Sequence, residues 1–309
     1  MSPKSKLILG TRGSPLALAQ AHMVRRLLAA SLARPEDSIE VLVLKTSGDR
    51  IQDRPLSEVG GKGLFTRELD EALEDGRIDL AVHSMKDVPT RLPDFMALAA
   101  VLPREDVRDR LLGAASIAGL APGARVGTSS LRRGAQMKAA RPDLVIVPFR
   151  GNVETRLAKL ERGEADATLL AAAGLNRLGM GHVGTPVPVD VLLPAPAQGA
   201  VGVTVRADDT PLRAAVAVLD HAPTAICVAA ERAFLAALDG SCRTPIAGWA
   251  RLGADGGRLT FSGQVLTPDG AHDVAGERVG SPADAAAIGA DLAADLKARG
   301  GPAITALFG

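Results

Sequence analysis

The segment Ala81-Val82-His83-Ser84-Met85-Lys86-Asp87-Val88-Pro89-Thr90 joins a predicted strand to a polar turn. The strand, residues 78–82, is short and apolar, and Pro89 prevents a helix from continuing after it. Ser84, Lys86 and Asp87 then stand together at the carboxyl end of a strand, where open α/β sheets bind ligands. The segment therefore predicts an α/β ligand site, with an ordinary surface pair of Lys86 and Asp87 as the alternative.

Length and composition limit the classes of protein. The 309 residues suffice for two or three domains of roughly 100–150 residues each. The net charge is +1, and Tyr is absent, so neither a nucleic acid nor a membrane is expected as partner. No apolar run approaches the ~18 residues of a membrane span, and the N-terminal apolar run is too short for a signal peptide. We expect a cytoplasmic protein with reduced cysteines and no metal site.

Two pairs of similar segments predict two related α/β domains. Residues 9–16 (LGTRGSPL) resemble residues 126–133 (VGTSSLRR), each reading as a strand, a Gly-Thr turn, a serine cap and the start of a helix. Residues 76–82 resemble 163–169 in the same order along the chain. Ser14 is a good N-cap for the predicted helix 16–32. Chance similarity of common strand-to-helix turns is the alternative.

The second of these domains has the features of an anion site. Residues 125–177 carry ten Lys and Arg against five Asp and Glu, a net charge of +5. Helix N-termini favour anions, and arginine pairs two-pronged with carboxylate or phosphate. Two such domains facing each other would form a cleft for a polyanion. Any single arginine is most simply interpreted as lying on a solvated helix face. Five of them at the ends of predicted elements favour an anion-lined cleft instead: Arg132, Arg133, Arg150, Arg156 and Arg177.

The remaining chain predicts a return to the first sheet and a third domain. Segments near 100–105 and 193–200 would be crossing linkers, so that the strand 201–205 completes the first sheet. A helix at 224–238, strands at 246–252, 259–266 and 272–279, and a helix at 282–299 predict an α+β domain. The expected domains are 1–100 with 199–219, then 105–194, and finally 222–309.

The two cysteines differ in their surroundings. Cys227 lies in an apolar helix and is most simply a core residue. Cys242 lies in a Gly/Ser/Arg/Pro loop, where the neighbouring Arg243 favours the thiolate. Because no histidine stands beside it as a base, its spacing alone makes Cys242 only a candidate nucleophile.

Taken together, these segments resemble the hydroxymethylbilane synthase family, also called porphobilinogen deaminases. The matching signatures span nearly the whole chain in the family's order: residues 11–17, 61–65, 81–89, 127–133, 150–153, 198–200 and 240–242 with 245–246. The departures are Met85 for leucine and Ala197 and Ser241 for glycines. Only Ala197 bears on function, because it affects how closely the backbone approaches a ligand.

The resemblance implies a fold and a reaction. The first two domains would be similar to type 2 periplasmic binding proteins, and a dipyrromethane cofactor would be joined by a thioether to Cys242. The enzyme would be a transferase of tetrapyrrole, porphyrin and heme biosynthesis, and a monomer. It would condense four porphobilinogen molecules head to tail, releasing ammonia each time, and then free the linear tetrapyrrole by hydrolysis.

The resemblance also assigns residues. Asp87 would be catalytic, because a carboxylate against the pyrrole N–H stabilises the positive charge that follows loss of ammonia. Lys62 and Phe65 would lie on a lid. The carboxylates of cofactor and substrate would be bound by Arg12, Ser14, Ser84, Lys86, Thr128, Ser130, Arg132, Arg133, Arg150, Arg156, Arg177 and Gln198.

Two other functions remain open from the residues alone. A two-lobed receptor for an anionic small molecule would explain the helix N-termini and the arginines. It gives no reason for a carboxylate, Asp87, inside an anion site or for an exposed cysteine. An RNA-binding enzyme would use the basic segment, but the chain has few aromatic residues for base stacking. Release of ammonia from porphobilinogen separates these alternatives from the enzyme.

Overall fold

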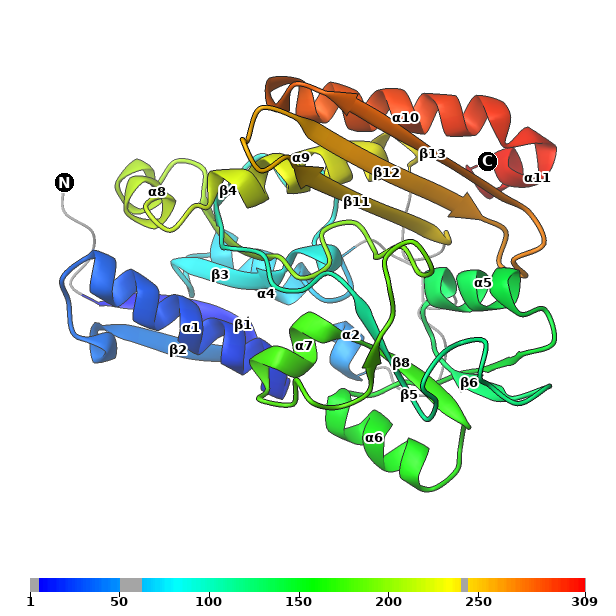
Figure 1. Cartoon of the computed structure of the whole chain (residues 1–309). Coiled ribbons are helices and arrows are strands. Elements are labelled where there is room, and N and C mark those ends of the chain that lie inside the picture. The colour runs from blue at the N-terminus through cyan, green and yellow to red at the C-terminus, as the bar shows by residue number, and fades with distance from the viewer. Residues whose placement is uncertain (1–5, 51–62, 240–243, 309) are drawn as a thin grey trace. The chain divides into compact units, whose positions relative to one another are not determined.

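A computed structural model describes residues 6–50, 63–239 and 244–308 (Figure 1). Its contacts divide the chain into two compact units. The first unit takes its described residues from 1–52, 61–105 and 199–225, and the second takes its own from 106–198 and 226–309. Each unit is described by itself below.

The first unit is built on a five-stranded mixed sheet in the order β2-β1-β3-β10-β4. The strand β1 runs parallel to β2 and β3, whereas β10 is antiparallel to β3 and β4. The prediction that a late strand completes the first sheet is therefore confirmed. The strands are β1 (Leu7–Arg12), β2 (Ile39–Leu44), β3 (Leu80–Ser84), β4 (Met96–Val101) and β10 (Val201–Arg206).

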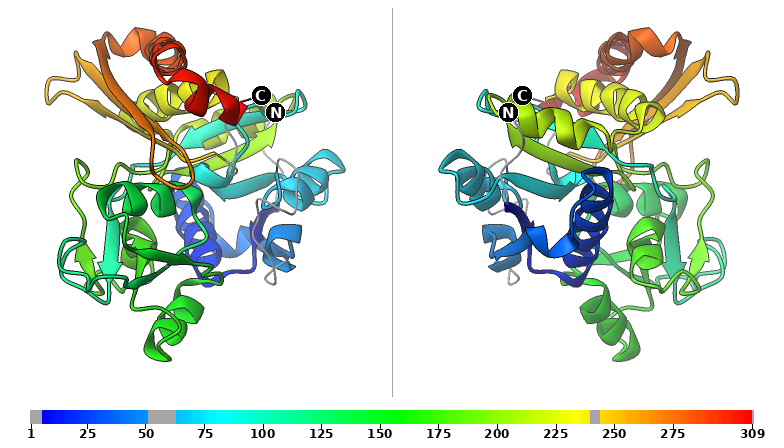
Figure 2. Two further views of the ribbon diagram at one scale, coloured as in Figure 1. Left: turned by 90° about the vertical axis from the view of Figure 1, so that its right-hand side faces the viewer. Right: turned by 90° about the vertical axis from the view of Figure 1, so that its left-hand side faces the viewer.

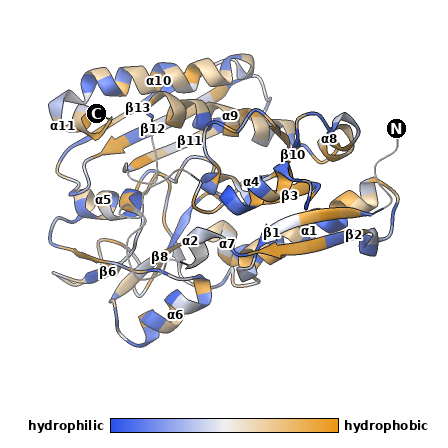
Figure 3. Ribbon diagram, turned by 180° about the vertical axis from the view of Figure 1, so that it is seen from behind, coloured by the Kyte–Doolittle hydropathy of each residue, from blue (hydrophilic) through white to orange (hydrophobic). Residues whose placement is uncertain are grey.

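Helices cover both faces of this sheet because both faces are apolar, as the colouring of β1 and β2 in Figure 3 illustrates. On one face α1 (Pro15–Ser31) and α8 (Thr210–Ala217) bury Leu28 and Val216 against the strands. On the other face α4 (Arg67–Glu74) buries Leu69 and Leu73. Short helices connect these elements: η1 (Glu36–Ser38), α2 (Ser47–Arg50) and η2 (Met85–Asp87).

Local signals in the sequence determine where α1 begins and where β3 ends, and both positions matter for the site. The predicted cap of α1 is confirmed, since the Ala17 N–H donates to Ser14 Oγ at 3.3 Å and Pro15 occupies the first turn. After β3 the chain makes only the single turn η2, and Val88 is extended before Pro89. The turn that carries Asp87 is therefore held directly at the end of β3.

The second unit contains a sheet of the same design, in the order β7-β6-β8-β5-β9. The strand β6 is parallel to β7 and β8, and β5 is antiparallel to β8, as β10 is to β3. The predicted relation between the two α/β domains is therefore confirmed. The elements are β5 (Asp109–Leu112), β6 (Arg125–Gly127), β7 (Val145–Val147), β8 (Ala167–Ala171), β9 (Thr185–Pro186), α5 (Leu131–Ala140), α6 (Val153–Glu161) and α7 (Ala172–Arg177).

The second unit also contains the predicted α+β domain, an antiparallel sheet β11-β12-β13 with helices on it (Figure 2). Helices α9 and α10 approach so closely that a Cβ on Gly289 would lie 2.1 Å from the Ala230 carbonyl oxygen. Phe234 and Phe261 meet edge to face at 5.0 Å in the core, and Cys227 is buried there as predicted. The elements are α9 (Ala222–Ala237), β11 (Ile246–Leu252), β12 (Leu259–Leu266), β13 (Asp273–Gly280), η3 (Pro282–Asp284), α10 (Ala285–Arg299), α11 (Gly301–Thr305) and η4 (Ala306–Phe308).

Within 6–50, 63–239 and 244–308, no single helix has the length and hydropathy of a membrane span, and α8 with α9 reaches them only as a bent pair.

Candidate functional site

The first unit brings Arg12 and Asp87 together at one edge of its sheet. Arg12 is the last residue of β1 and Asp87 ends the turn after β3, and these parallel strands present their carboxyl ends to the same edge. Arg12 Nη1 lies 3.4 Å from Asp87 Oδ2, and the side chains are 20% and 29% exposed. The pair is therefore reachable from solvent and carries one cation and one acceptor, as a ligand with an N–H and a carboxylate requires.

Phe65 forms the third member of this group. Its ring centroid lies 4.1 Å from Cζ of Arg12, which places the guanidinium over the ring face. Phe65 lies two residues before the start of α4, so the segment 63–66 places an aromatic face at the end of β1. Lys62, the other residue predicted on a lid, lies outside the described residues.

Ser84 is held by a residue that the sequence analysis did not single out. The side-chain amide of Gln20, on α1, lies 2.9 Å (Nε2) and 3.1 Å (Oε1) from Ser84 Oγ. Gln20 is buried, so its amide must find partners inside the fold. A polar residue inside the apolar run of α1 was the available signal. Gln20 fixes the hydroxyl that stands three residues before Asp87.

The other predicted residues of the first unit occupy different positions. Ser14 caps α1 through its oxygen, and Lys86 is exposed on η2. His83 precedes them inside the sheet, where its Nε2 lies 2.9 Å from Thr204 Oγ1. Burial, aided by the charge of Arg12, lowers the pKa of His83 to about 4. His83 is therefore a neutral ring behind the Arg12–Asp87 pair.

In the second unit, Thr128 and Ser130 shape the N-terminus of α5. Ser130 N–H donates to Thr128 Oγ1 at 3.1 Å, and Ser130 Oγ accepts from Arg133 N–H at 3.4 Å, which confirms the predicted cap. Thr128 is buried, whereas Ser130 is half-buried. This turn matches the one at Ser14 in the first unit. In each unit, therefore, a strand of the sheet is followed by a helix whose N-terminus is capped by a serine.

Arg132 and Arg133 converge on a buried carboxylate, Asp109 of β5. Their Nη2 atoms lie 2.7 Å and 2.6 Å from the two Asp109 oxygens, and all three side chains are almost fully buried. Arg132 also donates to the Leu193 carbonyl and Arg133 to the Leu169 carbonyl. Burial opposes ionisation of Asp109, but the two guanidinium groups outweigh it and hold the pKa of Asp109 well below its usual range.

Gln198 belongs to the same network. Its Nε2 donates to the Val107 carbonyl at 2.8 Å and to Asp109 Oδ1 at 2.9 Å. The residue before it, Ala197, has φ +61°, and its N–H donates to the buried carboxylate of Glu231. Ala197 thus takes a left-handed conformation that suits the glycine expected there.

Arg150 and Arg156 extend the positive charge beyond this network. Arg156 Nε donates to the Gly151 carbonyl at 3.0 Å. Burial and the charges of Arg133 and Arg150 lower the pKa of Arg156 to about 10. Arg177 is the half-buried last residue of α7. The arginines 133, 150 and 156 therefore repel one another and favour an anion among them.

Cys242, the predicted attachment residue, lies outside the described residues. Within 6–50, 63–239 and 244–308, no three His, Cys, Asp or Glu side chains are arranged to hold a metal ion.

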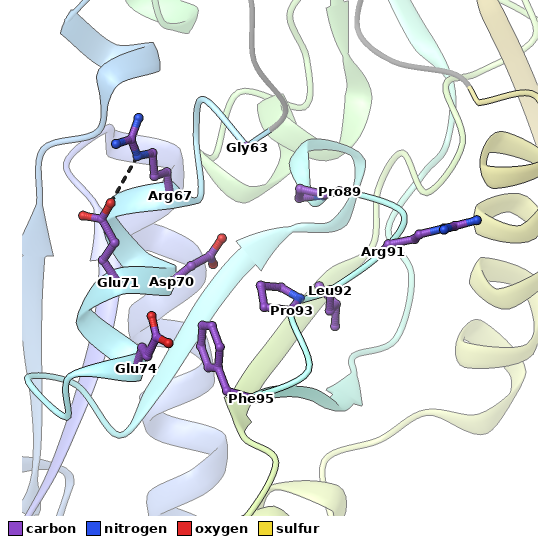
Figure 4. Close-up of a pocket in the computed structure, with 10 residues that line it drawn as sticks. All are labelled: Gly63, Arg67, Asp70, Glu71, Glu74, Pro89, Arg91, Leu92, Pro93 and Phe95. Atoms are coloured by element: carbon purple, nitrogen blue, oxygen red, sulfur yellow. Dashed lines mark hydrogen bonds and ion pairs between the residues drawn. The ribbon is translucent and has the colours of Figure 1, made fainter.

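A separate pocket of about 450 Å³ lies between α4 and the segment 89–95 (Figure 4). Asp70 and Glu74 reach toward it from α4, while Arg67 pairs with Glu71 at 3.1 Å. Burial, together with Glu71 and Glu68, raises the pKa of Asp70 to about 6. None of the predicted cofactor- or substrate-binding residues lines this pocket. Its lining is Gly63, Arg67, Asp70, Glu71, Glu74, Pro89, Arg91, Leu92, Pro93 and Phe95.

Comparison with known proteins finds similar sequences along nearly the whole chain. Residues 7–214 match the family model "Porphobilinogen deaminase, dipyromethane cofactor binding domain", and residues 225–298 match "Porphobilinogen deaminase, C-terminal domain". The porphobilinogen deaminase of Paracoccus denitrificans is 55% identical over 300 residues, 96% of this chain and 95% of that protein. That of Nitrobacter winogradskyi is 53% identical over 303 residues, 97% and 95% of the two chains.

Solved structures of more distant proteins are also similar. The VFT2 domain of Bordetella pertussis BvgS has a TM-score of 0.41 and 13% identity, covering 69% of this chain and 86% of its own. A periplasmic His/Glu/Gln/Arg/opine-family binding protein from Silicibacter pomeroyi has a TM-score of 0.36 and 16% identity, covering 69% and 88%. The fold class follows from the strand orders of the two five-stranded sheets.

Proposed function

The chain belongs to the porphobilinogen deaminase family, and we propose that Asp87, paired with Arg12 at the edge of the first sheet, is its catalytic residue. The enzyme is a transferase of porphyrin and heme biosynthesis, a hydroxymethylbilane synthase. It condenses porphobilinogen units with loss of ammonia on a dipyrromethane cofactor and releases the linear tetrapyrrole.

The chemistry explains why a carboxylate stands beside a cation. When the C–N bond of porphobilinogen breaks, ammonia leaves with the bonding electrons and positive charge spreads into the pyrrole ring. A C–C bond then forms to the free α-carbon of the neighbouring ring, and that carbon loses its proton. The Asp87 carboxylate accepts a hydrogen bond from the ring N–H and stabilises this charge most when it is largest. Only stabilisation of that kind accelerates the step.

Arg12 has a complementary role. Each pyrrole carries acetate and propionate side chains, and a guanidinium pairs with a carboxylate in two-pronged fashion. A substrate carboxylate on Arg12 would place the ring N–H next to Asp87, because the two side chains are 3.4 Å apart. Ser84, positioned by Gln20, and the exposed Lys86 add a hydroxyl and an ammonium at the same edge.

The second unit fits the carboxylates of the dipyrromethane. In the described part of the chain, Nε of Arg132 and Nε of Arg133 are buried without a hydrogen-bond partner. Burial, followed by the charges of Arg133 and Arg150, lowers the pKa of Arg156, and a carboxylate beside these three arginines would offset their mutual repulsion. We assign the cofactor's carboxylates to this cluster with Thr128, Ser130, Arg177 and Gln198. When bound, the dipyrromethane supplies the pyrrole carbon to which the first substrate unit is joined.

Cys242 is our proposed attachment residue, through a thioether. The wild-type protein is expected to exceed its sequence mass by two pyrrole units in an intact mass spectrum. Cys242→Ala is expected to fold and to show no added mass, while Cys227→Ala, a change in the core of α9, is expected to retain the addition. A Cys242→Ala protein that carries the extra mass refutes this assignment.

Release of ammonia from porphobilinogen tests the proposed role of Asp87. Asp87→Asn is expected to keep the fold and the added mass but to lower turnover by roughly 100-fold or more, since it removes the charge that stabilises the ring. Asp94→Asn, an exposed residue outside the described site, is the matched control and is expected to be unchanged. Turnover by Asp87→Asn within a few-fold of wild type contradicts the proposal.

We further propose three domains (1–100 with 199–219, 105–194 and 222–309) and a cytoplasmic monomer without nucleic-acid or membrane partners. The net charge of +1 supports the absence of a nucleic-acid partner. Light scattering on the eluting protein tests the monomer, and a dimer mass contradicts it.

A further inference from the structure

One member of the Arg12–Asp87 pair, Arg12, packs against the ring of Phe65. Arg12 is a long side chain with several rotatable bonds, and its Nη1 lies 3.4 Å from Asp87 Oδ2, beyond the usual N–H···O distance of about 2.9 Å. The Phe65 ring, 4.1 Å from Cζ, supplies a flat surface on which the guanidinium rests. Moving that ring would therefore move the guanidinium packed on it relative to Asp87.

Gly48, in the short helix α2, sets the position of the ring. A Cβ at residue 48 would lie 2.4 Å from both Cδ1 and Cε1 of Phe65, far inside contact distance. It would also lie 2.9 Å from the Leu64 carbonyl oxygen. The backbone of Gly48 is not in the left-handed region, so the requirement at this residue is for space rather than for an unusual conformation.

Hydrogen bonds hold the two segments together at this contact. Gly48 N–H donates to the Leu64 carbonyl at 2.8 Å. Ser47 donates to Glu68 Oε1 twice, from its N–H at 2.8 Å and from its hydroxyl at 2.5 Å. Gly48 is buried and Phe65 is half-buried. Because these bonds prevent the two backbones from separating, an added methyl group must displace the ring.

We propose that Gly48 is a positioning residue for the reaction: the space it leaves seats the Phe65 ring, and that ring holds Arg12 against Asp87. The inference rests on the proposed function of the Arg12–Asp87 pair. It predicts that residue 48 acts on catalysis only through Phe65, although it touches neither the pair nor a substrate.

A double-mutant cycle tests this dependence. Gly48→Ala is expected to lower kcat/KM for porphobilinogen by about tenfold or more, since small misplacements of reacting groups are costly. In a Phe65→Leu background the same change is expected to alter kcat/KM by less than about twofold, because no ring remains to be seated. Gly257→Ala is the control, since its Cβ would meet nothing closer than 3.5 Å. An equal loss in both backgrounds overturns the proposal.

A spectroscopic reading separates this proposal from the proposed function. The Arg12 Nε–H proton, identified by its absence in Arg12→Lys, is expected to show an upfield ring-current shift in the wild type. The shift is expected to disappear in both Phe65→Leu and Gly48→Ala while circular dichroism stays unchanged. If it persists in Gly48→Ala, the positioning role is refuted. Failure of the wild type to release ammonia would instead refute the proposed function and leave this shift unaffected.

Discussion

Replacing Asp109 with Asn provides a severe test of the buried network in the second unit. Asp109 is fully buried between Arg132 and Arg133, at 2.7 Å and 2.6 Å, and accepts a further bond from Gln198. Asn keeps the shape but removes the charge and turns an NH₂ group toward a guanidinium. Two cations then remain buried with no counter-charge from this residue. Breaking a buried pair in this way costs about 3–5 kcal/mol.

That cost is large compared with the 5–15 kcal/mol by which domains are usually stable. Amide hydrogen exchange across α5 and β5 is the appropriate assay, because a chain with two units need not unfold in a single step. The control is Asp166→Asn, which breaks an exposed pair with Arg125 at 3.1 Å and is expected to cost about 0.2–1 kcal/mol. If Asp109→Asn costs no more than the control, the network does not stabilise the unit as argued.

Three other predictions concern stability. Ala197→Gly is expected to raise the unfolding free energy by about 1 kcal/mol, because φ +61° strains an alanine; an unchanged or lower melting temperature would argue against that strain. His83 has a folded pKa of about 4, so its contribution, about 3 kcal/mol, is present above pH 6.5 and is lost as pH falls toward 4. Titrating stability in His83→Asn should show a shallower acid dependence, and an unaltered slope would exclude His83 as its source. Asp70 has a folded pKa raised to about 6, so the contribution of this carboxyl group to stability grows as pH falls from 6 to 4. Asp70→Asn should abolish that gain and be the more stable protein at pH 7, and equal stability at both pH values would contradict the burial argument.

The elements around the site could be predicted from the sequence because their signals are local. Ser14 and Ser130 each precede a helix start, and both are caps in the structure. The similarity of residues 9–16 to 126–133 predicted two related domains, and the strand orders confirm them. The apolar run at 201–205 reads as a strand wherever it lies, and its return to the first sheet followed from the order of the elements.

The contacts that hold the site were not predictable, because they join residues far apart in the chain. Asp109 stands between two arginines in the sequence and reads as a surface charge, yet it is buried beneath Arg132 and Arg133. Gln20 reads as one polar residue of a helix, although its partner, Ser84, is 64 residues away. A glycine at 48 gives no sign in the sequence that it packs on Phe65.

The role of Asp87 can be tested in a single turnover. Enzyme in excess is mixed with porphobilinogen and quenched, and the first C–N cleavage is followed while substrate affinity is measured separately. The account predicts that Asp87→Asn binds porphobilinogen as the wild type does but cleaves the C–N bond about 100-fold or more slowly. Cleavage at the wild-type rate would contradict it, and the catalytic group would have to be sought elsewhere at the end of the sheet.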